Sequence, residues 1–169
     1  MLKTSTMPNN ELVVSDTSPL LNLALIDQLT LLKSQFSSIT IPRQVWDELT
    51  DGEAGVDTLR SLHDDEFLTI TEVEQSHLFT EIFHELDLGE TAAICHAIEH
   101  DPDLILLDEK DGRQVARRHS LTVTGVIGIL LRGANAGDIE LKHELDALRD
   151  AGFWISDELY SKVLSEATE

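Results

Sequence analysis

The stretch Leu104-Ile105-Leu106-Leu107-Asp108-Glu109-Lys110-Asp111-Gly112 decides the fold class of this chain. Its first four residues are all apolar, as is typical of a strand buried on both faces in a parallel sheet. The charged residues that follow predict that the strand ends at Asp108 and that a helix begins soon after it. A buried strand that leads directly into a helix indicates a sheet covered by helices.

The N-terminal part of the chain repeats this pattern. The short run Leu12-Val13-Val14-Ser15 ends at Asp16, and Ser18-Pro19 then predicts the N-cap and first residue of a helix. Further strand-like runs lie at residues 38–41, 67–71 and 121–124. Because helical patterns separate these runs, we expect an α/β fold, a three-layer α/β/α sandwich with a short central parallel sheet and flanking helices.

Length and cysteine content limit the organisation of the chain. Its 169 residues are enough for one domain with a substantial core. We expect a single domain over residues 1–169, with a core at about 11–135 and a C-terminal helical extension at about 138–169. Cys95 is the only cysteine, so an intrachain disulfide and a thiolate metal cluster are excluded.

The charge is strongly negative. Asp and Glu outnumber Lys and Arg by 32 to 12, which gives a formal net charge of -20. Such a surface repels nucleic acid except where basic residues or cations gather, and it suits a halophilic source with a salt-rich cytoplasm. The longest apolar stretch, at 121–131, is too short to span a membrane. We therefore expect a cytoplasmic protein with no membrane partner.

Five acids stand where a strand ends or a helix begins: Asp16, Glu48, Glu90, Asp108 and Asp111. Ligands of open parallel sheets collect at the carboxyl ends of the strands, so acids far apart in sequence can meet there. Hard cations such as Mg²⁺ and Mn²⁺ prefer oxygen ligands. Such a site can activate water to attack a phosphodiester. The acids therefore predict one divalent-metal site.

Several of these positions also have simpler interpretations. Asp47 is next to Glu48, and helical phase alone does not say which of the two faces inward. Glu90 and Asp111 both lie at helix starts, where a carboxylate is favoured by the helix dipole alone. Thr17 is a candidate to orient water or phosphate, whereas Ser18 is better explained as an N-cap.

Other residues offer further candidate contacts. Lys110, Arg113 and Arg117 share one face of a predicted helix, where they either bind RNA phosphates or balance the acidic surface. His96 and His100 are one helical turn apart but lack the order of a zinc motif, so we assign them to surface or packing. We assign both tryptophans to the core or an interface rather than to base stacking, because each has apolar neighbours: Trp46 and Trp154.

The order of the motifs resembles a known family. The motifs are Val14 to Leu20, Ile41-Pro42 with Glu48-Leu49, Gly89-Glu90 with Ala92-Ala93, Leu107-Asp108 with Asp111, and Val123-Thr124-Gly125. Together they resemble the PIN domain, the nuclease fold of VapC-type toxins. Later motifs around Ala147-Leu148-Arg149 and Ser156 to Tyr160 resemble an uncharacterised PIN subfamily.

This resemblance implies a Mg²⁺- or Mn²⁺-dependent endoribonuclease, the toxin of a toxin–antitoxin pair, with RNA as substrate, a small antitoxin as partner and a homodimeric assembly. Asp16, Asp108 and Glu90 would bind the metal, with Glu48 and Asp111 completing the catalytic set. Two positions depart from the family pattern: Glu90 often corresponds to aspartate, and Gly112 replaces an aromatic residue.

Two other functions start from the same acids. One is a non-catalytic PIN-fold module that binds RNA or protein. The other is a receiver-like α/β domain, in which Asp16 or Asp108 would accept a phosphoryl group. The motif order favours the nuclease.

Overall fold

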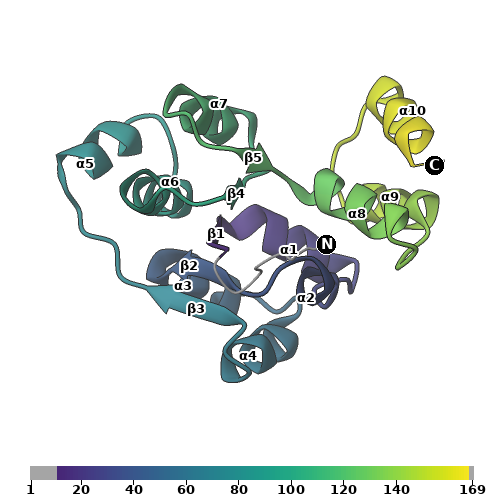
Figure 1. Cartoon of the computed structure of the whole chain (residues 1–169), viewed down its shortest axis with the longest axis horizontal. Coiled ribbons are helices and arrows are strands. Elements are labelled where there is room, and N and C mark those ends of the chain that lie inside the picture. The colour runs from purple at the N-terminus through teal and green to yellow at the C-terminus, as the bar shows by residue number, and fades with distance from the viewer. Residues whose placement is uncertain (1–10, 168–169) are drawn as a thin grey trace, which may run out of the picture.

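Five short strands form an all-parallel sheet in the order β3-β2-β1-β4-β5 (Figure 1). The computed structural model describes residues 11–167. The strands are β1 (Val13–Ser15), β2 (Ile39–Pro42), β3 (Leu68–Thr71), β4 (Leu104–Leu106) and β5 (Val123–Thr124). The chain builds outward from β1 to β3 and then returns to place β4 on the other side of β1. The order therefore reverses between β1 and β4, which is where ligands of such sheets bind.

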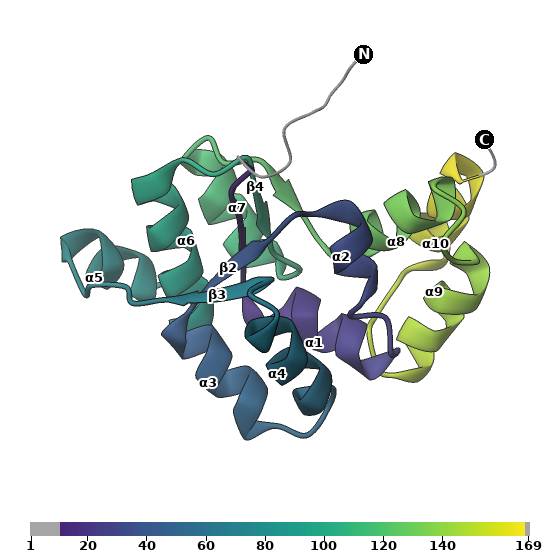
Figure 2. The same cartoon turned by 60° about the horizontal axis from the view of Figure 1, so that its bottom comes forward.

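Helices cover both faces of the sheet. They are α1 (Thr17–Leu25), α2 (Leu31–Gln35), α3 (Arg43–Asp51), α4 (Val56–Asp64), α5 (His77–Phe83), α6 (Leu88–His100), α7 (Lys110–Arg118), α8 (Val126–Asn135), α9 (Leu141–Asp150) and α10 (Asp157–Glu166). Figure 2 shows α5, α6 and α7 apart from the group formed by α8, α9 and α10. The prediction of an α/β fold with a parallel sheet between helices is confirmed.

Alternation along the strands divides the core in two. Successive side chains of a strand point to opposite faces, so Val13 and Leu106 join one cluster with α1, α2, α4 and α8. Val14 and Ile105 join a second cluster with α5, α6 and α7. Each central strand thus contributes apolar side chains to both layers, which explains why its sequence is an unbroken apolar run.

The C-terminal helices pack on the core. Leu145 and Leu148 of α9 are fully buried, and Val163 of α10 is 5% exposed. All three belong to the larger core cluster. The buried side chain of α10 therefore packs within the molecule.

One local prediction, the start of the first helix, was wrong. The helix α1 begins at Thr17, with Asp16 rather than Ser18 as its N-cap residue. The Asp16 backbone is extended, and its N–H continues the β1–β4 ladder by donating to Leu106 O at 3.1 Å. For Trp154, which was predicted to lie in the core or at an interface, the core is excluded because its side chain is 81% exposed, and the interface stays a prediction. Trp46 is partly buried and packs against the ring of His63.

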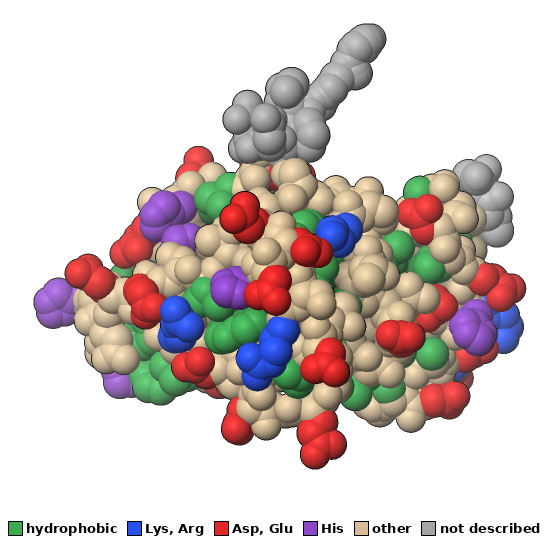
Figure 3. Space-filling model, turned by 90° about the horizontal axis from the view of Figure 1, so that it is seen from below, with side chains coloured by type: hydrophobic (Ala, Val, Ile, Leu, Met, Phe, Trp, Pro, Cys, Tyr) green, Lys and Arg blue, Asp and Glu red, His purple; other side chains and the backbone are tan. Residues whose placement is uncertain are grey.

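The surface carries the excess of acidic residues. Acidic side chains are spread over the face in Figure 3, whereas Lys and Arg occupy few places on it. Among residues 11–167, no helix has the length and apolarity that crossing a membrane requires.

Candidate metal and nucleic-acid site

Asp16 and Asp108 lie at the same edge of the sheet. They follow the neighbouring strands β1 and β4, whose register pairs Ser15 with Leu106. Asp16 is 2% exposed and Asp108 is partly buried. The sheet order reverses between these two strands, so the two acids stand at the crevice where α/β sheets bind ligands.

Oxygens from α1, α3 and the end of β1 meet over Gly89 of α6. The Thr17 hydroxyl donates a short hydrogen bond to Glu48 Oε1. A Cβ added at Gly89 would lie 2.5 Å from Glu48 Oε1 and 3.2 Å from both Asp16 Oδ1 and Thr17 Oγ1. The absence of a side chain at Gly89 therefore makes room for this group, and it is Glu48 rather than Asp47 that joins it, although the Glu48 side chain is exposed.

Asp108 is held by two hydrogen bonds. Its Oδ1 accepts from the backbone N–H of Val126 at 2.8 Å, and its Oδ2 accepts from Asn22 Nδ2 at 2.8 Å. Val126 is the first residue of α8, so the carboxylate lies at the positive end of a helix dipole. A Cβ at Gly125 would collide with Asp108 Oδ1, so glycine is required there for this approach.

Glu90 combines a capping role with an unpartnered oxygen. It forms a capping box with Asp87, whose Oδ1 accepts from the Glu90 N–H at 2.8 Å. Its Oε2 is buried and accepts no hydrogen bond within the described chain. A Cβ at Gly112 would lie 2.7 Å from this oxygen. The two positions that depart from the family pattern thus meet, because the longer Glu90 side chain lies against the bare backbone of Gly112.

Burial raises the pKa of three of these acids. The pKa of Asp16 lies well above its ordinary value because of desolvation, with the charges of Glu90, Asp87 and Glu48 adding to the effect. Desolvation and the charge of Asp87 raise the pKa of Glu90 to about 7. Desolvation also raises the pKa of Asp108, opposed by its two hydrogen bonds and by Arg113. A bound cation would offset these costs by stabilising the ionised carboxylates.

The raised pKa of Glu90 predicts that stability falls as pH rises. Its ordinary pKa is 4.5 and its pKa in the fold is about 7, so the fold favours the neutral carboxyl. The stabilising contribution is complete below pH 4.5 and is lost as pH rises through 7. Without divalent metal, we expect Glu90→Gln to remove ~1–3 kcal/mol of this pH dependence.

Chemical denaturation across this pH range at high salt measures the effect. Glu53→Gln is the matched control, because Glu53 is exposed on the loop after α3. The Glu53→Gln protein should show the same change of unfolding free energy with pH as the wild type. A Glu90→Gln protein with an unchanged slope would contradict the assignment of the titration to Glu90.

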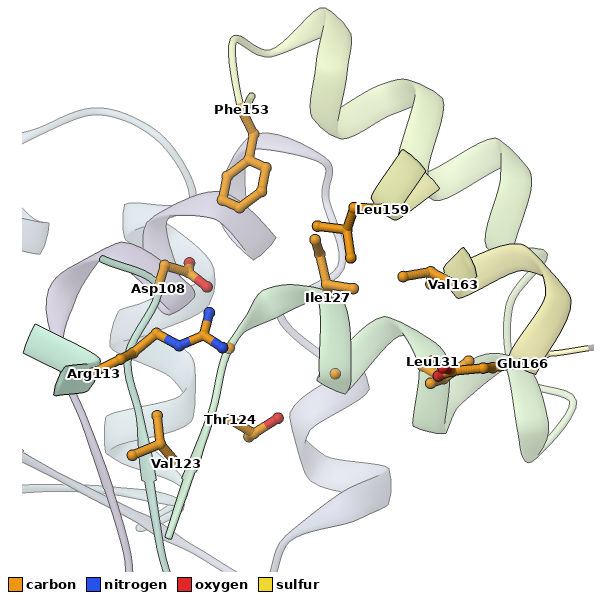
Figure 4. A pocket seen from close by; sticks show the side chains of 12 residues that line it. Asp108, Arg113, Val123, Thr124, Ile127, Leu131, Phe153, Leu159, Val163 and Glu166 are labelled. Atoms are coloured by element: carbon orange, nitrogen blue, oxygen red, sulfur yellow. The ribbon is translucent and has the colours of Figure 1, made fainter. Parts of the chain in front are cut away.

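Three basic residues of α7 adjoin the acids. In the described part of the chain, Lys110, Arg113 and Arg117 form no ion pair, whereas Arg118 pairs with Glu85 at 3.1 Å. These three cations and Asp108 line a hollow of about 320 Å³. Figure 4 shows Arg113 beside Asp108, on the wall of a neighbouring cavity of about 260 Å³. Unpaired cations beside an acid can bind a phosphate next to a metal.

The donor set fits a hard divalent cation. The nearby side chains offer carboxylate, hydroxyl and amide oxygens, and the orphaned Glu90 Oε2 needs a proton or a cation. In residues 11–167, however, no three His, Cys, Asp or Glu side chains are already gathered as a metal cluster. Asp16 and Glu48 gather at Gly89, while Asp108 is held at the start of α8.

The fold thus brings most of the predicted acids to one region. Asp16, Glu48, Glu90 and Asp108 lie around the carboxyl ends of β1 and β4. Asp111 is exposed on the first turn of α7, but its charge contributes to the raised pKa of Glu90.

Two polar residues of the site were missed from sequence. Asn22 holds Asp108, and Asp87 caps α6 and raises the pKa of Asp16 and of Glu90. Asn22 is the one amide in the apolar run Leu20-Leu21-Asn22-Leu23, and that is the signal that identifies it. Asp87 stands three residues before Glu90, which is the spacing of a capping box.

Comparison with known proteins supports the earlier resemblance. A family model described as PIN domain matches residues 12–169. No curated protein matches the sequence.

Proposed function

The chain belongs to the PIN domain family, a nuclease-type fold, and on that premise we propose that it is a metal-dependent endoribonuclease that hydrolyses RNA phosphodiester bonds. The observation that carries the proposal is the position of Asp16 and Asp108 at the point where the sheet order reverses. Buried acids with raised pKa values at such a point are costly for folding and therefore indicate a function.

The proposed metal ligands are Asp16, Asp108 and Glu90, whose oxygens suit Mg²⁺ or Mn²⁺. When bound, such a cation polarises the phosphodiester and lowers the pKa of a coordinated water. Glu48, oriented by the Thr17 hydroxyl, would accept a hydrogen bond from the attacking water. Asp111 would support the site from the start of α7.

The RNA contacts follow from the free cations. Lys110, Arg113 and Arg117 would bind phosphates beside Asp108, because no ion pair within the described chain neutralises them. With a net charge of -20, the rest of the protein repels RNA. Binding is therefore restricted to this part of the surface.

The proposal extends to a cytoplasmic toxin that forms a homodimer and is neutralised by a small antitoxin, in a halophilic cell. It is supported by the VapC-like motif order and by the acidic composition. Induced expression in a host cell should arrest growth, and the Asp108→Asn variant should not. Growth arrest by both proteins would show that the toxicity is not caused by RNA cleavage.

A cleavage assay tests the activity. A mixed pool of structured and single-stranded RNA is incubated with purified protein at high salt, in the presence of Mn²⁺, Mg²⁺ or chelator. We expect cleavage with metal and none with chelator, because the acids do not replace the charge that a cation provides on the leaving oxygen.

A second function is favoured by the separation of the acids into two groups, since no ready metal cluster is formed in residues 11–167. A non-catalytic module that binds RNA or protein would keep the acids for folding or for weak cation binding. A folded protein that binds RNA without cutting it under any metal condition would establish that alternative and overturn the nuclease.

A further inference from the structure

Trp154 is exposed to an extent that packing does not explain. It is 81% exposed, more than the other large apolar side chains found at the surface, such as Phe83 at 49%. A tryptophan contributes most to folding when its large apolar surface is buried. At this position the indole contributes little to the core, so a binding role accounts better for its presence.

The backbone around Trp154 is firmly held. Gly152 has φ +103, and its N–H donates to Arg149 O at 3.0 Å. The Phe153 N–H donates to Leu148 O at 3.0 Å, which completes a Schellman motif at the end of α9. After Trp154, Ile155 is 5% exposed, and its carbonyl accepts from Arg149 Nη2 at 2.9 Å. The exposed indole therefore projects from a segment anchored on both sides.

The indole of Trp154 lines the same hollow as Asp108, one of the candidate catalytic acids. This hollow, of about 570 Å³, is lined by Trp154 together with Ser18, Asn22, Asp108, Glu109 and Lys110. Its size falls within the roughly 300–1,000 Å³ of small-molecule sites. The preceding Phe153 lines the cavity with Asp108 and Arg113 (Figure 4). Consecutive aromatic side chains thus line two cavities that meet at Asp108.

We propose that Trp154 stacks on a base of single-stranded RNA next to the phosphate at Asp108, and so helps to select the cleavage position; this rests on the proposed function. Proteins bind single strands with aromatic surfaces beside basic residues, and Lys110 is the basic residue that lines this hollow. The polar side chains of Ser18 and Asn22 and the charge of Lys110 suit a nucleotide better than an apolar protein segment.

Binding of short single-stranded oligonucleotides tests the stacking. The chain has two tryptophans, so a Trp46→Phe protein has Trp154 as its only indole. With Mn²⁺ present, we expect single-stranded RNA to quench its fluorescence, and an abasic strand of the same charge to bind without quenching. Gel analysis after each measurement gives the fraction of intact strand, and quenching is compared at times when the strands are still intact.

Substitution at Trp154 provides the second measurement. Trp154→Ala should weaken RNA binding roughly tenfold or more, to the level of the abasic strand, while Trp154→Phe should keep most of the affinity. Phe83→Ala is the matched control, because Phe83 is an exposed aromatic residue on α5 that pairs with Phe79. It should bind as wild type does.

The outcomes separate this inference from the nuclease proposal. RNA binding that depends on Trp154, without any cleavage, would overturn the nuclease and support the stacking. Metal-dependent cleavage with unchanged binding by Trp154→Ala would overturn the stacking and leave the nuclease in place. Equal affinity for base-bearing and abasic strands, or no RNA binding at all, would also overturn it.

Discussion

Asp108→Asn is expected to reduce metal-dependent RNA cleavage by on the order of 100-fold or more while the protein stays folded. The substitution removes one charge that would hold the cation. It leaves the local hydrogen bonds in place, because the new amide oxygen still accepts from the Val126 N–H, and Asn22 can rotate its amide to accept from the new donor. Single-turnover cleavage with Mn²⁺ measures the loss.

The stability of the same variant shows whether the loss is chemical. Burial raises the pKa of Asp108, so the ionised carboxylate disfavours the fold and its removal should leave the unfolding temperature unchanged or raised. The exposed Asp57 of α4 offers a control, and Asp57→Asn should cleave normally. Full activity in a folded Asp108→Asn protein would refute the assignment of this acid.

Gly89→Ala is expected to lower cleavage by roughly 10- to 100-fold although it removes no charged group. The new Cβ would lie 2.5 Å from Glu48 Oε1, so the carboxylate has to move away from Thr17 and Asp16. Stability should change little, since Glu48 has an exposed, flexible side chain that can move away from the new Cβ. Cleavage rates and thermal unfolding together test this separation.

Two comparisons make the test of Gly89 specific. Gly52→Ala is the control, because a Cβ there would meet only Leu49 O at 3.6 Å. If Gly89→Ala acts through Glu48, then Gly89→Ala combined with Glu48→Ala should be no less active than Glu48→Ala alone. Additive losses would show that Gly89 affects the site by another route.

The elements of the fold follow closely from the sequence. The run Leu104 to Leu107 is apolar because its side chains enter both core clusters, and this local pattern is visible without any tertiary contact. The helix start predicted at Ser18-Pro19 was two residues too late, because a contact with a strand distant in sequence fixes the true start. The backbone of Asp16 is bound to Leu106 of another strand, which shifts the cap by two residues.

The candidate site could be predicted only in part. The sequence predicts that Asp16 and Asp108 lie at strand ends, because each follows an apolar run. It also predicts that they meet, because a parallel sheet brings the carboxyl ends of its strands to one edge. The choice of Glu48 over Asp47 depends on Thr17 and on the bare surface of Gly89, which belong to other helices. The sequence around Glu48 does not show that its carboxylate meets residues of these other helices.

The sequence by itself determined the layered α/β architecture and most of the acids of the site, since both depend on residue type and spacing along one element. Only the tertiary structure decided which oxygens meet, which cations stay unpaired within residues 11–167, and that the exposed Trp154 lines the same hollow as Asp108. These features depend on the packing of elements that are distant in sequence, and the sequence of one helix or strand does not specify which side chains of other elements contact it.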